Sequence, residues 1–583
     1  MADSLFIHLK SSYNLLDPSQ KREGKRLALS MIFNVFLDLF SLVSILPLVY
    51  VIFNEPDDEK HSIVSEIRQV FNFSDEKTLI LSTISVVLFF FILKTIYAFW
   101  VINWKAKYAT GMALGFSNKI YKHLLEKSHD GNVGEMAVNI TNIPYTFINK
   151  TINSFFDLSS KMVLITVVFF GLAFYDPDVL FYLSLVIVPV ALIYLKARSG
   201  YLKSIKTNLE KCQPALLQRT LDSLNGKTEI ILSGNKNIFF EEFSKINLLY
   251  SKTLMKRNVS VNSSAKFIEL IALLGICVLF ICITLFDYGK EEIFFTITVY
   301  SISAYKLIPS INGINVAYVN LKTHQYTTEI IEKHLKSHHF TKTSSTENVS
   351  PLVFKDSLSF KDVTFIYPDS LFTLKSISFS IQKYDKVAII GESGSGKSTI
   401  LQLILRTLSE AEGNLLVDEQ KITSGLASTY RKLISYVPQS VFLFEGTLLE
   451  NICMKDPELM KKTNEVNNIL EKLGLAEISG TSEKSLNYQI QDKGANVSSG
   501  QKQRIGIARA LMQNREIFVL DEITSNLDEE NQTALISFLQ NHNLDKTMVF
   551  ATHRTEIMTM CNVIIEVKAG KVKVTRKAAI QGT

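Results

Sequence analysis

The sequence predicts a chain of two parts, a membrane bundle of six transmembrane α-helices followed by an α/β domain with a parallel sheet. Hydrophobic residues make up 47% of the 583 residues and charged residues only 20%, below the roughly 25% usual in soluble proteins. Long apolar stretches occur before about residue 315, and short β-type runs alternate with helical runs after about residue 350. That alternation is typical of βαβ units. The composition argues against a disordered chain and against a purely soluble enzyme.

Each predicted membrane span is a mostly apolar segment near the length of about 20 residues that a helix needs to cross a bilayer. The spans lie at about residues 27–53, 79–102, 155–175, 178–197, 266–286 and 291–314. Residues 1–26 form an amphipathic lead-in without the apolar core of a signal peptide. The alternative is that some of these segments are core helices of a large soluble protein. Six such segments with a matching charge asymmetry favour the membrane.

The charges of the connecting segments predict the orientation of the bundle. The basic run Lys21–Arg26 and the basic connection at 196–266 are expected in the cytoplasm, because basic loops are retained there. The acidic loop at 54–77 is expected outside, so both termini lie inside. Within that loop, the apolar residues of 61–71 recur at helical spacing. This spacing predicts an interfacial helix that touches lipid, although packing against the membrane bundle is the alternative.

Composition also excludes some classes of site and partner. The five cysteines form no CxxC pair, so a zinc site or a disulfide framework is unsupported. The net charge of +6 is too small to indicate a nucleic-acid partner without a localised basic patch. We expect four segments: the lead-in at 1–26, the transmembrane domain at 27–336, a polar linker at 337–350 and a nucleotide-binding domain at 351–583.

A glycine-rich segment between an apolar strand and a helical run predicts a nucleotide-phosphate site. Its sequence fits the pattern GxxxxGK[ST] of a P-loop, in the strand–loop–helix context that this motif requires. Backbone N–H groups in such a loop converge on phosphate oxygens, the lysine binds the β- and γ-phosphates and the following hydroxyl binds Mg²⁺. ATP and Mg²⁺ are therefore the expected cofactors. The predicted phosphate-binding residues are Gly391, Glu392, Ser393, Gly394, Ser395, Gly396, Lys397, Ser398 and Thr399, with Ser398 also on the metal.

An acidic pair, Asp521 and Glu522, follows the apolar run at 517–520. A carboxylate at the end of a buried strand can hold the Mg²⁺ shell, and its neighbour can polarise water. Alone, an acidic pair after a strand would more often be an ordinary helix cap. Downstream of a P-loop, it predicts the metal and water side of the same site.

Further motifs occur in a fixed order. Residues 496–504 resemble the ABC signature followed by a basic helix, Gln439 matches the Q-loop, and residues 525–528 resemble the D-loop. His553 matches the switch histidine, and Tyr367 lies where the family stacks an aromatic ring on adenine. Residues 351–583 thus resemble an ABC ATPase domain on the cytoplasmic side, and the whole chain resembles an ABC exporter half-transporter of the type I kind.

The resemblance implies a role for each matching residue. Glu522 would be the general base, His553 would contact the γ-phosphate, and Gln439 and Asp521 would complete the Mg²⁺ and water shell. The nucleotide-binding residues would also include Ser498, Gly500, Gln501 and Asp528, with the signature closing on ATP held by the other subunit. The chain is therefore expected to pair with a second copy of itself, a heterodimer being the alternative.

One residue departs from the family pattern. Ser499 stands where the signature has a glycine. If the backbone at this position must adopt a conformation that only glycine adopts easily, the serine side chain destabilises it by about 1 kcal/mol or more. The sequence leaves open whether the signature is weakened at this point.

Ionisable residues inside the spans are candidates for the transport path, because burying a charge in a membrane is costly. Asp38, Lys94 and Lys306 are assigned to a substrate cavity, and Lys161 lies in the third span. The sharper interpretation is a basic cavity for an anionic headgroup. The alternatives are that Asp38 pairs with a lysine, or that Lys94 and Lys161 reach toward the cytoplasmic edge.

The predicted transmembrane domain resembles the lipid-linked oligosaccharide flippases of bacterial protein glycosylation. The features that carry the resemblance are Asp38, Lys94, the external segment 61–71 and the segment Tyr305–Ser310. The resemblance implies ATP-driven flipping of such a lipid, or a similar anionic amphipathic lipid, in a bacterial inner membrane. The alternatives are an exporter of peptides, drugs or another lipid, and a non-transporting ABC channel or sensor. Glu522 disfavours the last of these.

Overall fold

The chain divides into two compact units, Met1–Phe340 and Thr341–Thr583. The predicted external helix at 61–71 and the D-loop at 525–528 lie outside the described residues. The computed structural model describes residues 13–45, 76–126, 133–285, 290–342, 352–367, 373–475, 478, 485–492, 494–524, 529–541 and 545–577.

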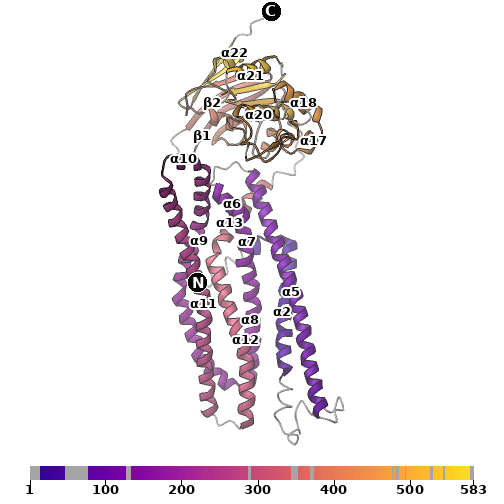
Figure 1. The fold of residues 1–583 in the computed structure, drawn as a ribbon, viewed down its shortest axis with the longest axis vertical. Helices are drawn as coiled ribbons and strands as arrows, with labels where there is room; N and C mark the ends of the chain where they lie inside the picture. Colours follow the sequence, from indigo (N-terminus) through magenta and orange to yellow (C-terminus); the bar gives the residue numbers. More distant parts are fainter. Residues whose placement is uncertain are drawn as a thin grey trace, which may run out of the picture. The chain divides into compact units, whose positions relative to one another are not determined.

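Long helices dominate the first unit (Figure 1). Its six longest described helices are α2 (Pro18–Val43), α5 (Glu76–Glu126), α8 (Asn153–Tyr175), α9 (Pro177–Asn225), α11 (Lys236–Leu285) and α12 (Lys290–Thr323). Each of them overlaps one of the predicted spans. Among the described residues, the stretches that are long and apolar enough to cross a membrane are Pro18–Val43, Ile80–Leu125, Ile143–Tyr175 and Lys236–Thr284, and α9 adds the shorter apolar stretch Pro177–Val190.

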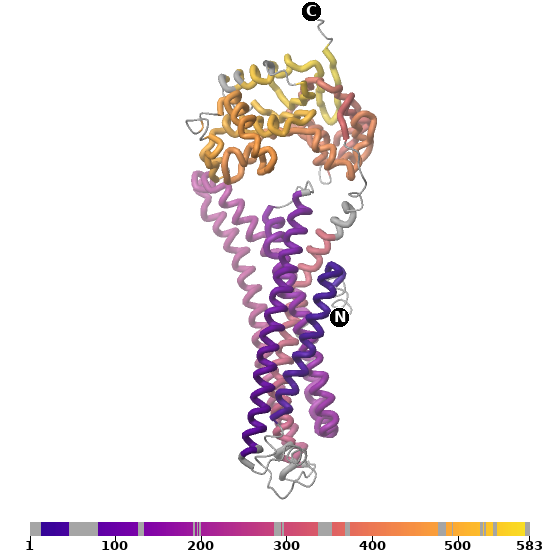
Figure 2. The backbone as a smooth tube through the Cα atoms, turned by 90° about the vertical axis from the view of Figure 1, so that its right-hand side faces the viewer, coloured from indigo at the N-terminus to yellow at the C-terminus, as the bar shows by residue number. Residues whose placement is uncertain are grey.

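Three of these helices are far longer than the spans predicted within them. Helices α5, α9 and α11 contain 51, 49 and 50 residues, or about 75 Å each at 1.5 Å per residue. The hydrocarbon core of a bilayer is only about 30 Å thick. The basic connection at 196–266 therefore consists largely of the ends of α9 and α11, joined through the short helix α10 (Lys227–Leu232). These two helices pack against each other, and Figure 2 shows them running side by side over a long distance.

The exposure of apolar side chains differs between the predicted spans and the rest of this helical unit. Phe116, Phe147 and Leu202 are almost completely buried and lie outside the predicted spans. Phe99 and Phe174 lie inside the spans and are 68% and 90% exposed. Large exposed apolar surfaces are unfavourable in water, so this distribution fits helices whose predicted spans face lipid. Shorter elements complete the unit: α6 (Val133–Thr141), α7 (Ile143–Phe147), the π-helical turn η2 (Ile148–Ile152) and α13 (Gln325–Lys342).

Helix α13 corrects part of the predicted linker. The segment 337–350 was expected to be aperiodic, but α13 remains helical as far as Lys342, and residues 343–350 lie outside the described part of the chain. The segment Gln325–Lys342 contains neither glycine nor proline, the two residues that most strongly interrupt helices. Polarity alone was therefore a poor indicator of where the helix ends.

The second unit contains a mixed sheet and an antiparallel sheet. The antiparallel sheet has the order β2-β1-β4-β5 and the six-stranded sheet the order β12-β11-β3-β10-β9-β6. The strands of the larger sheet are β3 (Lys386–Ile390), β6 (Ile434–Val437), β9 (Ile517–Asp521), β10 (Thr547–Ala551), β11 (Val563–Lys568) and β12 (Lys571–Arg576). The other strands are β1 (Ser357–Ile366), β2 (Thr373–Gln382), β4 (Glu412–Val417), β5 (Gln420–Lys421), and the pair β7 (Gly446–Thr447) and β8 (Gln489–Ile490).

The register of the parallel strands positions the site. Ala551 at the end of β10 pairs with Asp521 on β9 and with Ile389 on β3. The carboxyl ends of these three strands are therefore level. Ligands of α/β proteins bind beyond this edge of the sheet, and the residues that follow β3, β9 and β10 are the P-loop, Glu522 and the segment containing His553.

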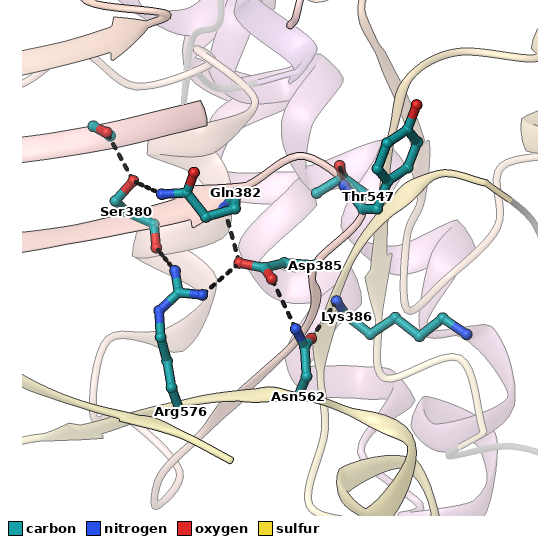
Figure 3. Close-up of polar contacts among 9 residues, drawn as sticks. Ser380, Gln382, Asp385, Lys386, Thr547, Asn562 and Arg576 are labelled. Atoms are coloured by element: carbon teal, nitrogen blue, oxygen red, sulfur yellow. Dashed lines mark hydrogen bonds and ion pairs between the residues drawn. The ribbon is translucent and has the colours of Figure 1, made fainter. Parts of the chain in front are cut away.

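A buried carboxylate fastens the two sheets together (Figure 3). Asp385 accepts hydrogen bonds from the Gln382 backbone at 2.8 Å, from Asn562 Nδ2 at 2.8 Å and from Arg576 Nη1 at 3.1 Å. Arg576 also donates to the carbonyl oxygen of Ser380 at 2.9 Å, and Asn562 Oδ1 accepts from the Lys386 backbone at 2.7 Å. The network joins β2, the start of β3 and the last strand β12, so the C-terminal edge of the domain is fixed to its centre.

Candidate nucleotide site and membrane pocket

The P-loop joins β3 to α14 (Lys397–Ile404) through backbone conformations that favour glycine. Gly391, Gly394 and Gly396 have φ angles of 150°, 79° and 112°. A Cβ atom at Gly391 would collide with the carbonyl oxygen of Val567, and Gly396 is the N-cap of α14. The loop therefore directs the chain into the start of a helix, where free N–H groups favour an anion.

Lys397 is held inside this loop without a carboxylate partner among the described residues. Its Nζ donates to the carbonyl oxygens of Gly391 at 2.7 Å and Glu392 at 2.9 Å. Burial lowers the pKa of Lys397, against the opposing effect of the Glu522 and Asp521 carboxylates. The Ser395 hydroxyl is buried and has no hydrogen-bond partner in the described part of the chain. A buried ammonium on neutral acceptors and an orphan hydroxyl fit the phosphates of ATP.

Tyr367, the predicted adenine contact, lies beside the same helix. Its hydroxyl is 3.3 Å from the Thr399 hydroxyl, and its ring meets Phe365 edge-on with a centroid separation of 4.8 Å. The ring is only partly buried. An aromatic face next to the P-loop helix is a suitable surface for a base to stack on.

Glu522 lies where three strands end. Its Oε2 accepts from Gln439 Nε2 at 2.6 Å, and its Oε1 is 3.6 Å from His553 Nε2. The backbone of Glu522 is left-handed, with φ of 43°, and its N–H donates to the carbonyl oxygen of Ala551 at 3.0 Å. This conformation is costly for a residue with a side chain and is concentrated at functional sites. It brings the three predicted catalytic residues together.

Asp521 supplies the second carboxylate and reveals a residue that the sequence did not assign. Burial and the neighbouring Glu522 raise the pKa of Asp521. The Tyr436 hydroxyl donates to Asp521 Oδ2 at 3.4 Å, and burial, with the nearby carboxylate, raises the pKa of Tyr436 to about 12. The sequence motifs assign no role to Tyr436. Its contact depends on β6 lying next to β9, which no local motif indicates.

These residues can complete a magnesium site only with the nucleotide. No group of three or more His, Cys, Asp or Glu side chains within the described ranges could hold a metal ion. Mg²⁺ is usually bound through one or two carboxylates together with substrate phosphates and waters. The residue set of Ser398, Asp521 and Gln439 fits that pattern.

The signature segment forms a reciprocal helix cap. The Ser498 hydroxyl accepts from the Gln501 backbone at 3.2 Å, and Gln501 Oε1 accepts from the Ser498 backbone at 2.9 Å. Ser499 is the first residue of α20 (Ser499–Gln513) and is absent from the positive-φ residues among those described. The glycine-only backbone that the sequence left open is therefore not the one adopted, and a helical first turn accepts a serine. Asp528 lies outside the described residues.

The membrane residues assigned to the cavity form an ion-pair triad. Lys94 Nζ lies 2.6 Å from Asp38 Oδ1, and Lys306 Nζ lies 2.7 Å from Asp38 Oδ2. The side chains are 19%, 18% and 23% exposed for Lys94, Lys306 and Asp38. The alternative in which Asp38 pairs with a lysine is thus the one observed, with two lysines instead of one, and the basic cavity for an anionic headgroup stays a prediction.

A pocket of about 410 Å³ opens beside this triad between α2, α8 and α12. Asp38 and Lys306 line it, whereas Lys94 is not among its lining residues. Its wall combines charged, hydroxyl and apolar side chains. The lining residues are Asn34, Val35, Asp38, Asp157, Ser160, Lys161, Leu164, Tyr305, Lys306, Pro309 and Ser310.

Comparisons with known proteins agree on the architecture. The ABC transporter family profile matches residues 374–525. The chain is 26% identical to the ATP-dependent lipid A-core flippase 1 of Colwellia psychrerythraea over 473 residues, covering 78% of this chain and 77% of the relative. It is 27% identical to the transport/processing ATP-binding protein ComA of Streptococcus pneumoniae over 429 residues, covering 73% and 58%. A bacterial Atm1-family ABC exporter with ATP bound has the same fold, with a TM-score of 0.76, 18% identity and 95% of each chain covered.

The structural match extends over the helical unit and the ATPase unit, and the family profile identifies the latter independently. The glycine-rich loop, the acidic pair and the switch histidine occupy one edge of a parallel sheet, as an ABC ATPase requires. The chain is therefore an ABC exporter half-transporter, a helical transmembrane domain fused to an ABC ATPase that couples ATP hydrolysis to transport.

Proposed function

We propose that this protein uses ATP to flip a lipid-linked oligosaccharide, or a similar anionic amphipathic lipid, across a membrane. The observation that carries the proposal is the pocket beside the Lys94–Asp38–Lys306 triad, whose wall is both charged and apolar. An amphipathic lipid offers both kinds of surface. Relatives named as lipid A-core flippases support a lipid cargo.

The ATPase residues divide into binding and proton-transfer roles in this proposal. Lys397 exchanges its carbonyl partners for phosphate oxygens, and the Ser395 hydroxyl gains an acceptor. Ser398, Asp521 and Gln439 hold Mg²⁺, which when bound offsets the charge on the phosphates. Glu522 accepts the proton of the attacking water, since its carboxylate lies at the sheet edge between Gln439 and His553.

A second copy of the chain completes the site. Ser498 and Gln501 hydrogen-bond each other among the described residues, rather than any residue of their own P-loop. The signature and Asp528 would act on ATP held by the partner, and Gly500 in the first turn of α20 allows close approach of a phosphate. A homodimer with two-fold symmetry is the simplest assembly, with a heterodimer as the alternative.

The proposed setting is a bacterial inner membrane with the ATPase domain in the cytoplasm. The basic residues Lys21–Arg26 at the start of α2 support this orientation. Residues 1–26 would form the lead-in, 27–336 the transmembrane domain and 351–583 the nucleotide-binding domain. No nucleic acid takes part in this function.

Vectorial transport in proteoliposomes tests the proposal. Purified protein should move a fluorescent anionic lipid between leaflets in the presence of ATP and Mg²⁺, and a Glu522→Gln variant should not. Movement of peptides or drugs without lipid movement would favour the exporter alternative. ATP-dependent conductance without any transported cargo would favour the channel alternative.

A further inference from the structure

We propose that Lys161 on α8 binds a phosphate of the cargo headgroup, and that the Lys94–Asp38–Lys306 triad only supports the pocket. The inference rests on the proposed function and names the residue that recognises the cargo. It follows from the distribution of ion pairs around the pocket, the space around Lys161 and the chemistry of the pocket wall.

Among the described residues, three lysines around the pocket are held in ion pairs, and Lys161 is not. Asp38 holds Lys94 at 2.6 Å and Lys306 at 2.7 Å, and Lys105 Nζ lies 2.6 Å from Asp157 Oδ1. A new anion would have to compete with a carboxylate already in contact with each of those ammonium groups. Releasing either lysine would also leave the partly buried Asp38 short of a partner.

Lys161 has no ion pair or hydrogen bond to any residue in the part of the chain that the structure describes, although it lines the pocket. Its side chain is half-buried. It lies about 12 Å along α8 from Asn153 at the rise of 1.5 Å per residue. An ammonium at this depth without a direct ion-pair partner is costly, and a bound anion would reduce that cost.

Gly313 on α12 provides the room for this side chain. A Cβ atom at Gly313 would collide with Cδ, Cε and Nζ of Lys161. The lysine therefore packs its end directly against the α12 backbone. Because the colliding atoms belong to the flexible end of one side chain, an alanine at 313 would move the lysine without disrupting the helices.

The remaining wall of the pocket suits the junction between a phosphate and a hydrocarbon chain. Ser160 and Ser310 carry hydroxyls that can donate to phosphate oxygens, and Val35, Leu164 and Pro309 offer an apolar side. The charged side chains described in and around the pocket are four lysines and two aspartates, so their net charge is +2. A phosphate monoester carries about −1.5 to −2 charges at neutral pH, which matches this excess.

The test measures ATPase activity of the full-length protein in vesicles of phosphatidylcholine, alone or mixed with phosphatidic acid. Phosphatidic acid should stimulate the wild type. Lys161→Gln should raise the mole fraction needed for half-maximal stimulation about tenfold to a hundredfold, the factor for losing one charge-assisted hydrogen bond. Lys161→Arg should restore part of the response, because the charge remains while the geometry changes.

Two further variants separate a local effect from a general one. Gly313→Ala should weaken stimulation without removing any charge, because it displaces the end of Lys161. Lys266→Gln is the matched control on α11, since Lys266 is 78% exposed and pairs only with Glu269 three residues away among the described residues. Its response should equal that of the wild type.

The outcomes distinguish this inference from the proposed function. A Lys161→Gln protein that responds at wild-type mole fractions overturns the inference and leaves lipid flipping intact. A wild type that neither responds to phosphatidic acid nor flips a fluorescent form of it overturns both. In a third outcome, inorganic phosphate stimulates the protein in pure phosphatidylcholine vesicles while phosphatidic acid does not. That result would identify a soluble anion as the ligand and overturn the assignment of a lipid headgroup to Lys161.

Discussion

The P-loop and the membrane pocket are the two regions that we assign to phosphate-bearing ligands, and they are built differently. In the P-loop, Lys397 is placed by glycines within six residues of it in sequence, and its ammonium is held by two backbone carbonyls. In the pocket, Lys161 on α8 packs against Gly313 on α12, while the carboxylates that α2 and α8 contribute to the wall pair with other lysines. One site is local in sequence and the other is assembled by helix packing.

This difference indicates how much amino-acid substitution each region tolerates. Nearly every substitution in the P-loop affects a backbone conformation or a phosphate ligand, so the local site tolerates little variation. A pocket assembled by packing can exchange one charged residue for another while the helices remain in place. A shared ATPase domain and a variable cargo pocket would allow one architecture to serve many substrates.

The largest expected effect is in the ATPase site that contains the P-loop. Glu522→Gln should lower ATP hydrolysis by about 10²-fold to 10⁴-fold, the contribution typical of a general base, while ATP binding persists. Nucleotide binding and steady-state hydrolysis measured on the same preparation check this. Glu566→Gln, on an exposed position of β11, is the control and should hydrolyse ATP normally. Wild-type turnover by Glu522→Gln would remove the general-base role.

Lys397→Ala tests the binding half of the same site. The loss of one charge-assisted contact to phosphate should weaken ATP affinity by about 1.5–3 kcal/mol, or roughly tenfold to a hundredfold. Titration with a fluorescent ATP analogue measures the change. Unchanged affinity would mean that Lys397 keeps its Gly391 and Glu392 carbonyl partners when nucleotide binds, contrary to our assignment.

Asp38→Asn probes the region assembled by packing. It leaves Lys94 and Lys306 without their shared counter-charge and should destabilise the helical unit by about 1–3 kcal/mol, since breaking a partly buried ion pair leaves charges unpaired. Thermal unfolding in detergent measures the loss. Glu419→Gln breaks the exposed pair with Lys361 and should change stability by less than about 1 kcal/mol. Equal effects of the two variants would show that the triad is not structural.

The smallest effect is expected at the signature. Because Ser499 adopts a helical first-turn backbone, Ser499→Gly should change the stability of the ATPase domain by no more than about 1 kcal/mol. ATP hydrolysis should stay near the wild-type rate. Denaturant unfolding and hydrolysis rates measure the two quantities, and a large loss of hydrolysis would instead assign the serine hydroxyl a contact with nucleotide.

The sequence alone could predict site residues where a motif of a few contiguous residues specifies both the chemistry and the backbone. The P-loop, Asp521 and Glu522 were assigned from contiguous patterns, and the parallel strands bring them to one edge of the sheet. Tyr436 was missed because its contact with Asp521 requires knowing that β6 neighbours β9. Strand order depends on tertiary packing rather than on any local pattern.

The helical unit shows the same limit. Hydropathy located the apolar parts of α5, α9 and α11, but it did not indicate that each helix continues far beyond the bilayer, because the extensions are polar. The partners of Asp38 were also undecided from the sequence. Pairing depends on how α2, α5 and α12 are rotated about their axes, and apolar surroundings give little periodic signal for that rotation.

The hydrogen bond between β12 and Asp385 determines when the ATPase domain can finish folding during translation. Arg576 belongs to the last described strand, yet its partners Ser380 and Asp385 were made almost two hundred residues earlier. While the chain leaves the ribosome, the carboxylate of Asp385 therefore lacks its arginine partner until 191 further residues have been synthesised. The ATPase domain can complete its fold only after release of its final strand, so nascent chains halted before residue 571 should remain sensitive to protease, whereas a tag placed after the strand should be tolerated.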